Sequence, residues 1–240
     1  MKKGGKKSLL LIGLLIAICG GSYRIGIAIF GCKEYSFSLD SRLSDTMQKS
    51  IKHAVHESYF GSLALLGGLI QNVCPAAGAI AIERRGNNVL HISCKSETPY
   101  LILADQFVLL KNGQTVEKKC FSPTAIQHLA VIDIKNMNGL IAFSTEFKQW
   151  LLQLDESIFQ NYAISWADDY EIYLTDKNDA HKNIICSVGN SVNRSIREKC
   201  QQIISEKSMH AQGTAHYCSA DIRFEKQIII CSQKGGACHG

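Results

Sequence analysis

Apolar and polar residues alternate over residues 34–39, where Tyr35, Phe37 and Leu39 share one face, as in a half-buried strand. Farther along, the spacing of apolar residues changes to four, which places them in one stripe along a helix. The stripe comprises Leu43, Met47, Ile51, Val55 and Tyr59. Asp40 or Ser41 is expected to cap this helix. The pattern therefore predicts a strand followed by an amphipathic helix.

A second helix and a hairpin are predicted directly after the first helix. The second helix covers residues 62–73 and ends before Pro75, which cannot continue it. Its inward-facing residues are expected to be Leu63, Leu66, Leu69 and Ile70. Strands over 79–84 and 89–96 flank Gly86-Asn87-Asn88, whose residue types favour a turn. Residues 34–96 are thus predicted to have the order β-α-α-β-β.

The rest of the chain mixes the same two patterns without repeating the sequence. Strands are predicted at 101–103, 107–110, 130–134, 162–167, 170–175, 183–188, 217–224 and 227–232. One amphipathic helix is expected over 145–160, and another after Asn190, which is expected to cap it. Asn112-Gly113 favours a tight turn because both residues tolerate positive φ. These elements predict an α+β fold.

The first 30 residues account for the net charge of the whole chain. They contain four lysines and Arg24 but no acidic residue, and the formal charge of the chain is +5. The remainder is therefore electrically balanced and has no basic run that would attract nucleic acid. We expect no nucleic-acid partner.

An uncharged apolar run over residues 8–23 is followed by Arg24 and a second apolar run. A helix over residues 8–30 is long enough to span a membrane if Arg24 reaches the outer interface. The lysines before it should stay in the cytoplasm, which places the rest of the chain outside. A cleaved signal peptide has the same layout, and Cys19 or Cys32 could instead carry a lipid. All three interpretations export the remainder of the protein.

Ten cysteines are a high number for a chain of this length. Export would permit disulfides, whereas the lack of a Cys-x-x-Cys spacing argues against a redox motif or a zinc knuckle. Cys94 and Cys186 lie on predicted central strands, so we expect them to be buried thiols with a high pKa and slow reactions. The sequence assigns no disulfide pairing.

No catalytic constellation is evident in the sequence. Neither His-x-x-x-His nor Gly-x-Ser-x-Gly occurs. His53 and His56 lie at i, i+3 on a predicted helix without an acidic or cysteine partner, and Asp168-Asp169 is typical of a turn. Cys231 and the Cys238-His239 pair amount to half a metal site at most. We therefore expect no enzyme, no metal and no cofactor, and interpret the chain as a binding or scaffolding protein.

Two stretches resemble the FtsQ/DivIB family of cell-division proteins. Residues 79–99, AIAIERRGNNVLHISCKSETP, and 107–113, FVLLKNG, are similar to the hairpin and following strand of that family's POTRA domain. Residues 220–230, ADIRFEKQIII, resemble its closing strand pair, which contains an Asp-Leu-Arg-Tyr motif. The order of elements is also similar. The Gly-Asn-Asn turn, the short Glu97-to-Pro99 spacing, a double glycine in a helix and the many cysteines depart from the family pattern.

The resemblance implies a non-enzymatic, single-pass scaffold of the septum machinery in the inner (plasma) membrane. Its N-terminus would be cytoplasmic and its domains extracytoplasmic. The expected regions are a basic N-terminus over 1–7, a membrane anchor or signal segment over 8–30, a POTRA-like domain over 33–110, a C-terminal α+β domain over 111–232 and a flexible tail over 233–240.

The resemblance also implies a partner-binding edge near the C-terminus. Arg223 and Phe224 match the Arg-Tyr of the motif, and the strand after it pairs with a segment of FtsB in the family. The expected partner-binding residues are Arg223, Phe224, Glu225, Ile228, Ile229 and Ile230. Partners would be FtsB/FtsL-like coiled-coil proteins bound by strand addition, because a terminal strand leaves backbone groups unpaired. Arg223 is expected to hold a partner carboxylate. The alternative is that the isoleucines and Phe224 are core residues.

Other functions fit some of the same features. A POTRA-like module of another exported assembly protein has a similar order of elements. A disulfide-stabilised exported binding protein unrelated to division would also account for the export segment and the cysteines. An exported hydrolase fits less well, because no nucleophile–base pair is evident.

Overall fold

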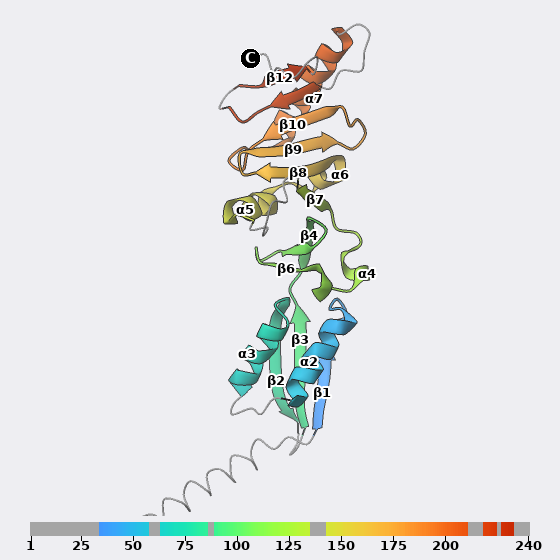
Figure 1. Ribbon diagram of the computed structural model, residues 1–240, viewed down its shortest axis with the longest axis vertical. Coiled ribbons are helices and arrows are strands. Elements are labelled where there is room, and N and C mark those ends of the chain that lie inside the picture. The colour runs from blue at the N-terminus through green and yellow to red at the C-terminus, as the bar shows by residue number, and fades with distance from the viewer. Residues whose placement is uncertain are drawn as a thin grey trace, which may run out of the picture. The chain divides into compact units, whose positions relative to one another are not determined.

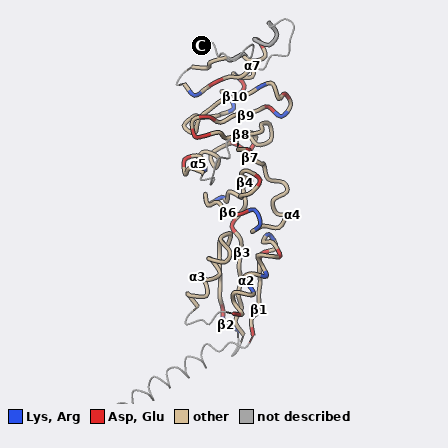
Figure 2. Tube along the Cα trace, viewed as in Figure 1, with Lys and Arg blue, Asp and Glu red and all other residues tan. Residues whose placement is uncertain are grey.

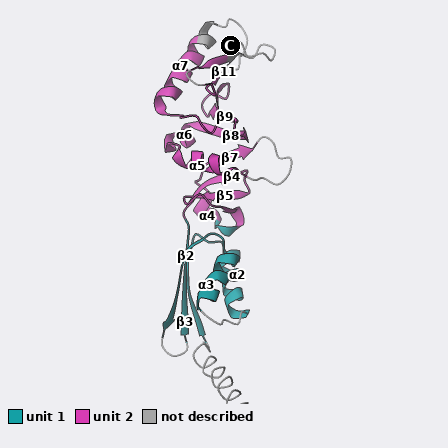
Figure 3. Ribbon diagram, turned by 90° about the vertical axis from the view of Figure 1, so that its left-hand side faces the viewer, with its two compact units in different colours: residues 1–97, 120–122 teal, residues 98–119, 123–240 magenta. Residues whose placement is uncertain are grey.

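The structure, a computed structural model, divides the protein into two compact units (Figures 1 and 3). It describes residues 34–57, 63–85, 89–134, 143–210, 218–224 and 227–232. The first unit contains the chain up to Glu97 together with Cys120–Ser122, and the second contains Thr98–Lys119 and the chain from Pro123 onward. Both units combine helices with a sheet, which confirms the α+β class.

The boundary between the units falls after Glu97, whereas the sequence predicts it after residue 110. β4 (Pro99–Leu103) pairs antiparallel with β5 (Phe107–Leu110) and parallel with β7 (Val131–Ile134). Both β4 and β5 therefore belong to the second sheet. Strand pairing, which sequence proximity does not reveal, decides the boundary.

The first unit has the predicted β-α-α-β-β order. Its elements are β1 (Glu34–Leu39), α2 (Asp45–Glu57), α3 (Leu63–Val73), β2 (Ala77–Arg85) and β3 (Val89–Ser96). β3 lies in the centre of the sheet, antiparallel to β2 and parallel to β1. The two helices lie on one face of this sheet (Figure 3).

The buried residues of the first unit follow the predicted stripes. They include Met47, Ile51, Val55, Leu66, Ile70, Leu90, Ile92 and Cys94. Leu63, which was predicted to face inward, is instead 42% exposed at the first residue of α3. The helical periodicity is therefore right from Leu66 onward, and only the first turn departs from it.

The second unit is built on a nine-stranded sheet with the order β12-β11-β10-β9-β8-β7-β4-β5-β6. The remaining strands are β6 (Thr115–Glu117), β8 (Tyr162–Asp168), β9 (Glu171–Asp176), β10 (Lys182–Cys186), β11 (Cys218–Asp221) and β12 (Ile229–Ser232). β7 pairs parallel with β8, and β10 pairs parallel with β11. The short helices η1 (Lys118–Cys120) and α4 (Pro123–Ile126) follow β6.

Two helices occupy the region where the sequence predicts a single one over 145–160. They are α5 (Thr145–Gln153) and α6 (Glu156–Asn161). Leu154 has an extended backbone that ends α5, and the Asp155 carboxylate accepts the backbone N–H of Ser157 at 2.8 Å. An N-cap of this kind starts a new helix, so the apolar periodicity continues across a real break in the backbone.

Two other helices begin at caps that the sequence did not predict. α2 begins after Ser44, whose hydroxyl accepts a backbone N–H of the first turn, while Asp40 forms an ion pair. α7 (Arg194–His210) begins after Asn193, whose amide oxygen accepts a backbone N–H, and the Asn190 amide oxygen is bound elsewhere. Asp40 and Asn190 both have side chains that can cap a helix, but each is bound to other groups.

Helices α5, α6 and α7 cover one face of the second sheet (Figure 3) and share its apolar core. The helices contribute Phe147, Trp150, Leu151, Ile158, Phe159, Cys200 and Ile204. The strands contribute Leu101, Leu103, Leu109, Ile132, Ile164, Ile172, Leu174, Ile184, Cys186 and Ala220. Because side chains alternate along a strand, the residues between these positions point to the opposite face. Asp221 and Ile229 are among those residues.

Several predicted features lie outside the described residues. They are the basic N-terminus 1–7, the anchor or signal segment 8–30, the hairpin turn 86–88, Glu225 and the tail 233–240. Within the ranges that the structure does describe, no helix combines the length and the apolar character needed to cross a membrane.

Candidate partner-binding edge

β12 is the last strand at one end of the second sheet. It pairs antiparallel with β11, with Asp221 opposite Ile229 and Cys218 opposite Ser232. In the described part of the chain, no strand lies on the other side of β12. Every second residue of such a strand directs its N–H and C=O groups away from its neighbour. β12 can therefore accept an added strand.

The three isoleucines of the predicted edge have different roles. Ile228 and Ile230 are partly buried and pack against the apolar core of the second unit. Ile229 lies between them and points to the opposite face of the sheet, where it is half-buried. Ile228 and Ile230 thus anchor the strand, and Ile229 is the isoleucine whose side chain lies on the face opposite α5, α6 and α7.

Arg223 is held within the protein by Asp221. Its Nε donates to both carboxylate oxygens at 3.0 and 3.1 Å, its Nη2 donates at 2.7 Å, and its backbone N–H donates at 3.0 Å. The side chain of Asp221 is only 6% exposed, and that of Arg223 is 32% exposed. These hydrogen bonds raise the pKa of Arg223 above its ordinary value. Arg223 is therefore the counter-ion of a buried carboxylate within its own unit. Its expected contact with a partner carboxylate stays a prediction.

Phe224 is an exposed aromatic residue beside the edge strand. Half of its surface is accessible to solvent, and its C=O accepts the backbone N–H of Gln227 at 3.2 Å in the turn that leads to β12. Phe224 is therefore a surface residue, which the sequence left open. Large exposed aromatic side chains are common anchors of protein interfaces.

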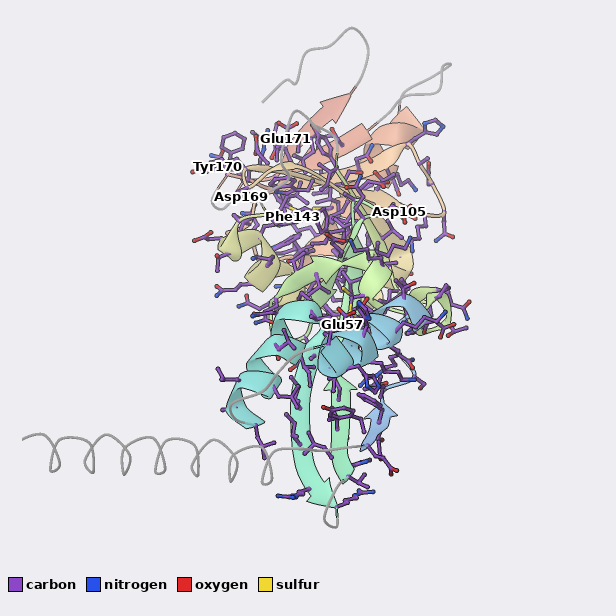
Figure 4. All side chains as sticks on the ribbon, turned by 60° about the horizontal axis from the view of Figure 1, so that its bottom comes forward. Glu57, Asp105, Phe143, Asp169, Tyr170 and Glu171 are labelled. Carbon is purple, nitrogen blue, oxygen red and sulfur yellow. The ribbon has the colours of Figure 1, made fainter. Side chains whose placement is uncertain are left out.

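The turn between β8 and β9, two inner strands of the sheet, carries acidic residues and a second exposed aromatic residue. Figure 4 shows Asp169, Tyr170 and Glu171 next to one another, and Tyr170 is 79% exposed. The charges of Glu171 and Asp168 act on the guanidinium of Arg223. Figure 2 shows acidic residues in red next to β8 and β9. Tyr170 was not predicted as a site residue, because only its acidic neighbours distinguish it from any other turn residue.

The two aspartates of this turn have the structural role that the sequence predicted. The Asp168 carboxylate accepts the backbone N–H of Tyr170 at 2.8 Å, and the Asp169 carboxylate accepts the indole N–H of Trp166 at 3.3 Å. The C=O of Asp169 also accepts the N–H of Val188. These bonds hold the turn in place and leave Tyr170 on the surface.

A polar cavity of about 430 Å³ lies elsewhere in the second unit. The buried Arg197 donates to the hydroxyl of Ser157 at 3.1 Å and lies 6.0 Å from the centre of the Tyr162 ring. The Gln201 amide donates to the Tyr162 hydroxyl at 2.7 Å and to Asp176 at 3.0 Å. Neither histidine nor cysteine is among the described residues that line it. The side chains that line the cavity therefore form a hydrogen-bond network.

The predicted histidine pair is engaged with neighbouring side chains. His53 lies 3.1 Å from the Glu57 carboxylate, and the ring of His56 packs edge-on against Tyr35 at 4.9 Å between centroids. Across the described ranges, no three His, Cys, Asp or Glu side chains gather as a metal site requires. Cys238 and His239 lie outside those ranges.

Both cysteines that were predicted to be buried are fully buried, but their thiols differ in pKa. Burial raises the pKa of Cys186 to about 12, in line with the prediction. The pKa of Cys94 is instead lowered, because the Cys74 thiol donates a hydrogen bond to it. The prediction of a high pKa for Cys94 is therefore wrong, since its neighbour is another thiol.

The edge is suited to binding a polypeptide, through backbone pairing along β12, aromatic contact at Phe224 and the charges around Arg223. No protein-family model and no curated protein matches the chain. The assignment of this edge as a binding site therefore rests on its geometry and its charge.

Proposed function

We propose that the protein is a non-enzymatic, single-pass membrane scaffold of the bacterial septum machinery, of the FtsQ/DivIB type. Its second unit binds an extended segment of a partner along β12. The observation that supports this most directly is the position of β12 at the end of the sheet, next to the exposed Phe224. Backbone pairing supplies the affinity in this mode of binding, and neighbouring side chains supply the specificity.

The first unit adds support through its topology. Two helices on one face of a three-stranded sheet, with the central strand parallel to β1 and antiparallel to β2, form a module similar to a POTRA domain. Small modules of this kind have exposed sheet edges of their own. We place the partner at β12 because the exposed Phe224 lies beside this strand.

The partners fit the chemistry of the edge and the layout of the chain. A basic start and an apolar run would place the described residues outside the inner membrane. Coiled-coil proteins of the FtsB/FtsL type, anchored in the same membrane, would present an extended segment next to their helix. Anchoring both proteins in one membrane raises their effective concentration, so a short edge of four residues suffices for recognition.

Replacing Phe224 by Ala tests this proposal with little risk to the fold, because the side chain is half exposed. We expect the Kd for the extracytoplasmic part of the FtsB-like protein of the same cell to rise by roughly 30-fold, which corresponds to about 2 kcal/mol. Leu65→Ala is the matched control, since Leu65 is 65% exposed and lies on α3 of the other unit. Unchanged binding by the Phe224 variant in calorimetry would contradict the assignment.

Hydrogen exchange tests the mode of binding independently of any substitution. Strand addition should slow the exchange of alternate backbone amides in Ile229–Ser232, namely those that point away from β11. Protection confined to other elements would show that the partner binds elsewhere.

A fluorescent fusion of the full chain separates division from the alternative of an exported binding protein unrelated to it. The division proposal predicts that the fusion concentrates at the septum. An even distribution around the cell membrane would contradict the division role and leave the binding edge in place.

A further inference from the structure

Two buried cysteines of the first unit lie next to each other although they are far apart in the sequence. Cys74 directly follows α3, and Cys94 lies near the end of β3, the central strand. Neither side chain has any exposed surface. Their thiols are hydrogen-bonded to each other.

Backbone hydrogen bonds hold the two cysteine-bearing segments together. The C=O of Cys74 accepts the N–H of Ala77 at 3.0 Å, and Ala77 is the partner of Ser96 in the β2–β3 ladder. The C=O of Ala76 accepts the N–H of Glu97 at 2.8 Å. The turn between α3 and β2 is therefore fixed beside the end of β3, which keeps the two thiols in contact.

We propose that Cys74 and Cys94 form a disulfide that joins the end of α3 to the central strand of the first unit. A disulfide requires two cysteines whose backbone segments lie side by side, and the hydrogen bonds at Ala77 and Glu97 hold these two segments in that way. The bridge would close a loop over residues 75–93, which contains β2. It would thereby stabilise the unit mainly by restricting the unfolded chain.

The oxidant is a disulfide, such as oxidised glutathione or the disulfide of a thiol oxidase. The Cys94 thiolate attacks one donor sulfur, breaks the donor S–S bond and forms a mixed disulfide. Cys74 then loses its proton and attacks the Cys94 sulfur, which expels the second donor sulfur. Two protein thiols are oxidised, and the donor leaves as two thiols that carry the two protons.

Because both thiols are buried in the folded protein, the disulfide must form before the first unit is fully folded. A donor cannot reach either sulfur in the folded unit, so the bond forms while the core is still open and is afterwards shielded from reductants. Formation of the bond in solution requires only a disulfide donor. Its formation in the cell additionally rests on the proposed export to an oxidising compartment.

The test uses the full chain in detergent, reduced and unfolded, then refolded in a buffer of reduced and oxidised glutathione. Alkylation of the free thiols, proteolysis and mass spectrometry should reveal a peptide that joins Cys74 to Cys94. The oxidised protein should melt on the order of 10 °C higher than the reduced protein. Finding both cysteines alkylated in the folded protein, or joined to other cysteines, would overturn the proposal.

Matched double variants identify the source of the thermal shift. The difference in Tm between oxidised and reduced protein should vanish in Cys74→Ala/Cys94→Ala. It should persist in Cys186→Ala/Cys200→Ala, which removes two buried thiols from the second unit. If the first pair of substitutions lowers the Tm of both redox forms, the peptide map of the unaltered chain still decides.

Mapping the cysteine peptides of protein isolated directly from cells tests the disulfide separately from the proposed function. A Cys74–Cys94 peptide found in cells supports both the pairing and the export. Thiols that are reduced in cells but pair in the glutathione buffer would support the disulfide and contradict the export.

Discussion

Each unit of the protein contains an Asp-x-Arg sequence whose two charged side chains form the same ion pair. We call this arrangement a fork. Asp40 and Arg42 follow β1, and Asp221 and Arg223 stand at the end of β11. In both forks the backbone N–H and the guanidinium of the arginine donate to the aspartate two residues earlier, with Nη2 at 2.8 and 2.7 Å. An Asp side chain readily accepts a backbone N–H two residues ahead, so this part of the geometry is local.

The two forks differ in what lies around them. The Asp40 carboxylate also accepts the backbone N–H and the hydroxyl of Ser96, both at 3.0 Å, and Arg42 donates to the C=O of Ser96 at 3.0 Å. The hydrogen bond from Arg42, together with those from Ser96, holds the pKa of Asp40 well below its ordinary value. This fork therefore clamps the end of β1 to the end of β3.

The second fork has no comparable third partner within the described residues. Asp221 is held by Arg223, and the nearby charges of Glu171 and Asp168 are negative. A motif of three residues thus forms the same ion pair twice, but its surroundings make one fork a clamp and leave the other beside an exposed surface.

Reversing the charge of Arg223 should have the largest effect. Arg223→Glu leaves the buried Asp221 without a counter-ion and adds a fourth carboxylate to the local cluster, so we expect unit 2 to lose about 3 kcal/mol of unfolding free energy. Arg42→Glu should destabilise unit 1 by about half as much, because Ser96 still binds Asp40.

Denaturant titration can measure both variants. The only tryptophans of the chain, Trp150 and Trp166, lie in unit 2 and report its unfolding by fluorescence, while hydrogen exchange reports on unit 1. An equal loss of stability in the two units would contradict the difference between the forks. A loss of stability by the Arg223 variant would also make it unsuitable for a binding assay.

Neutralising the aspartates should lower the unfolding free energy of unit 1 more than that of unit 2, which is the reverse of the order expected for the two arginine substitutions. Asp40→Asn removes an acceptor that serves both Arg42 and Ser96, so unit 1 should lose about 2 kcal/mol of unfolding free energy. Asp221→Asn should lower the unfolding free energy of unit 2 by about 1 kcal/mol, because its only described partner is Arg223. The same denaturant and exchange measurements apply. A larger effect of the Asp221 substitution would refute the clamp assigned to Asp40.

The stability of unit 1 should fall in acid because of Asp40. Its pKa in the folded protein lies below the ordinary value of 3.8, so the unfolded chain binds the proton more tightly. The stabilisation is present above about pH 4 and is lost as the pH falls toward the folded-state pKa. Hydrogen exchange of the β3 amides between pH 6 and pH 3 measures it. In Asp40→Asn this part of the pH dependence should be absent, and its persistence would assign the acid sensitivity to other groups.

Substitutions of two glycines should change the stability least, and they should have opposite signs in the two units. Gly68 lies within α3 and has nothing within 4 Å of an added Cβ, so Gly68→Ala should stabilise unit 1 by about 1 kcal/mol. Gly113 has a φ of +85°, so Gly113→Ala should destabilise unit 2 by about 1 kcal/mol. Thermal melts monitored by circular dichroism, together with fluorescence for unit 2, can resolve both changes. A destabilising Gly68→Ala would mean that the free space beside this helix is occupied in solution.

The sequence predicted the elements that depend on neighbouring residues. The apolar spacing located α2 and α3, and alternation located β1 and β3, because these periods follow from the geometry of a single helix or strand. Asn112-Gly113 marked a turn that needs positive φ at Gly113. The turn at Ala104-Asp105 has positive φ at both residues and no glycine, and it carried no such signal.

Local patterns by themselves determined that this protein is an α+β chain with a strand-rich C-terminal end and an Asp-x-Arg sequence beside it. Tertiary structure decided that β4 and β5 join the second sheet, that Cys74 meets Cys94, and that Arg223 forms an ion pair with Asp221. The physical reason is that hydrogen-bond partners and burial depend on residues far away along the chain. A periodicity records which face of an element is apolar, and it contains no information about which distant group will lie against that face.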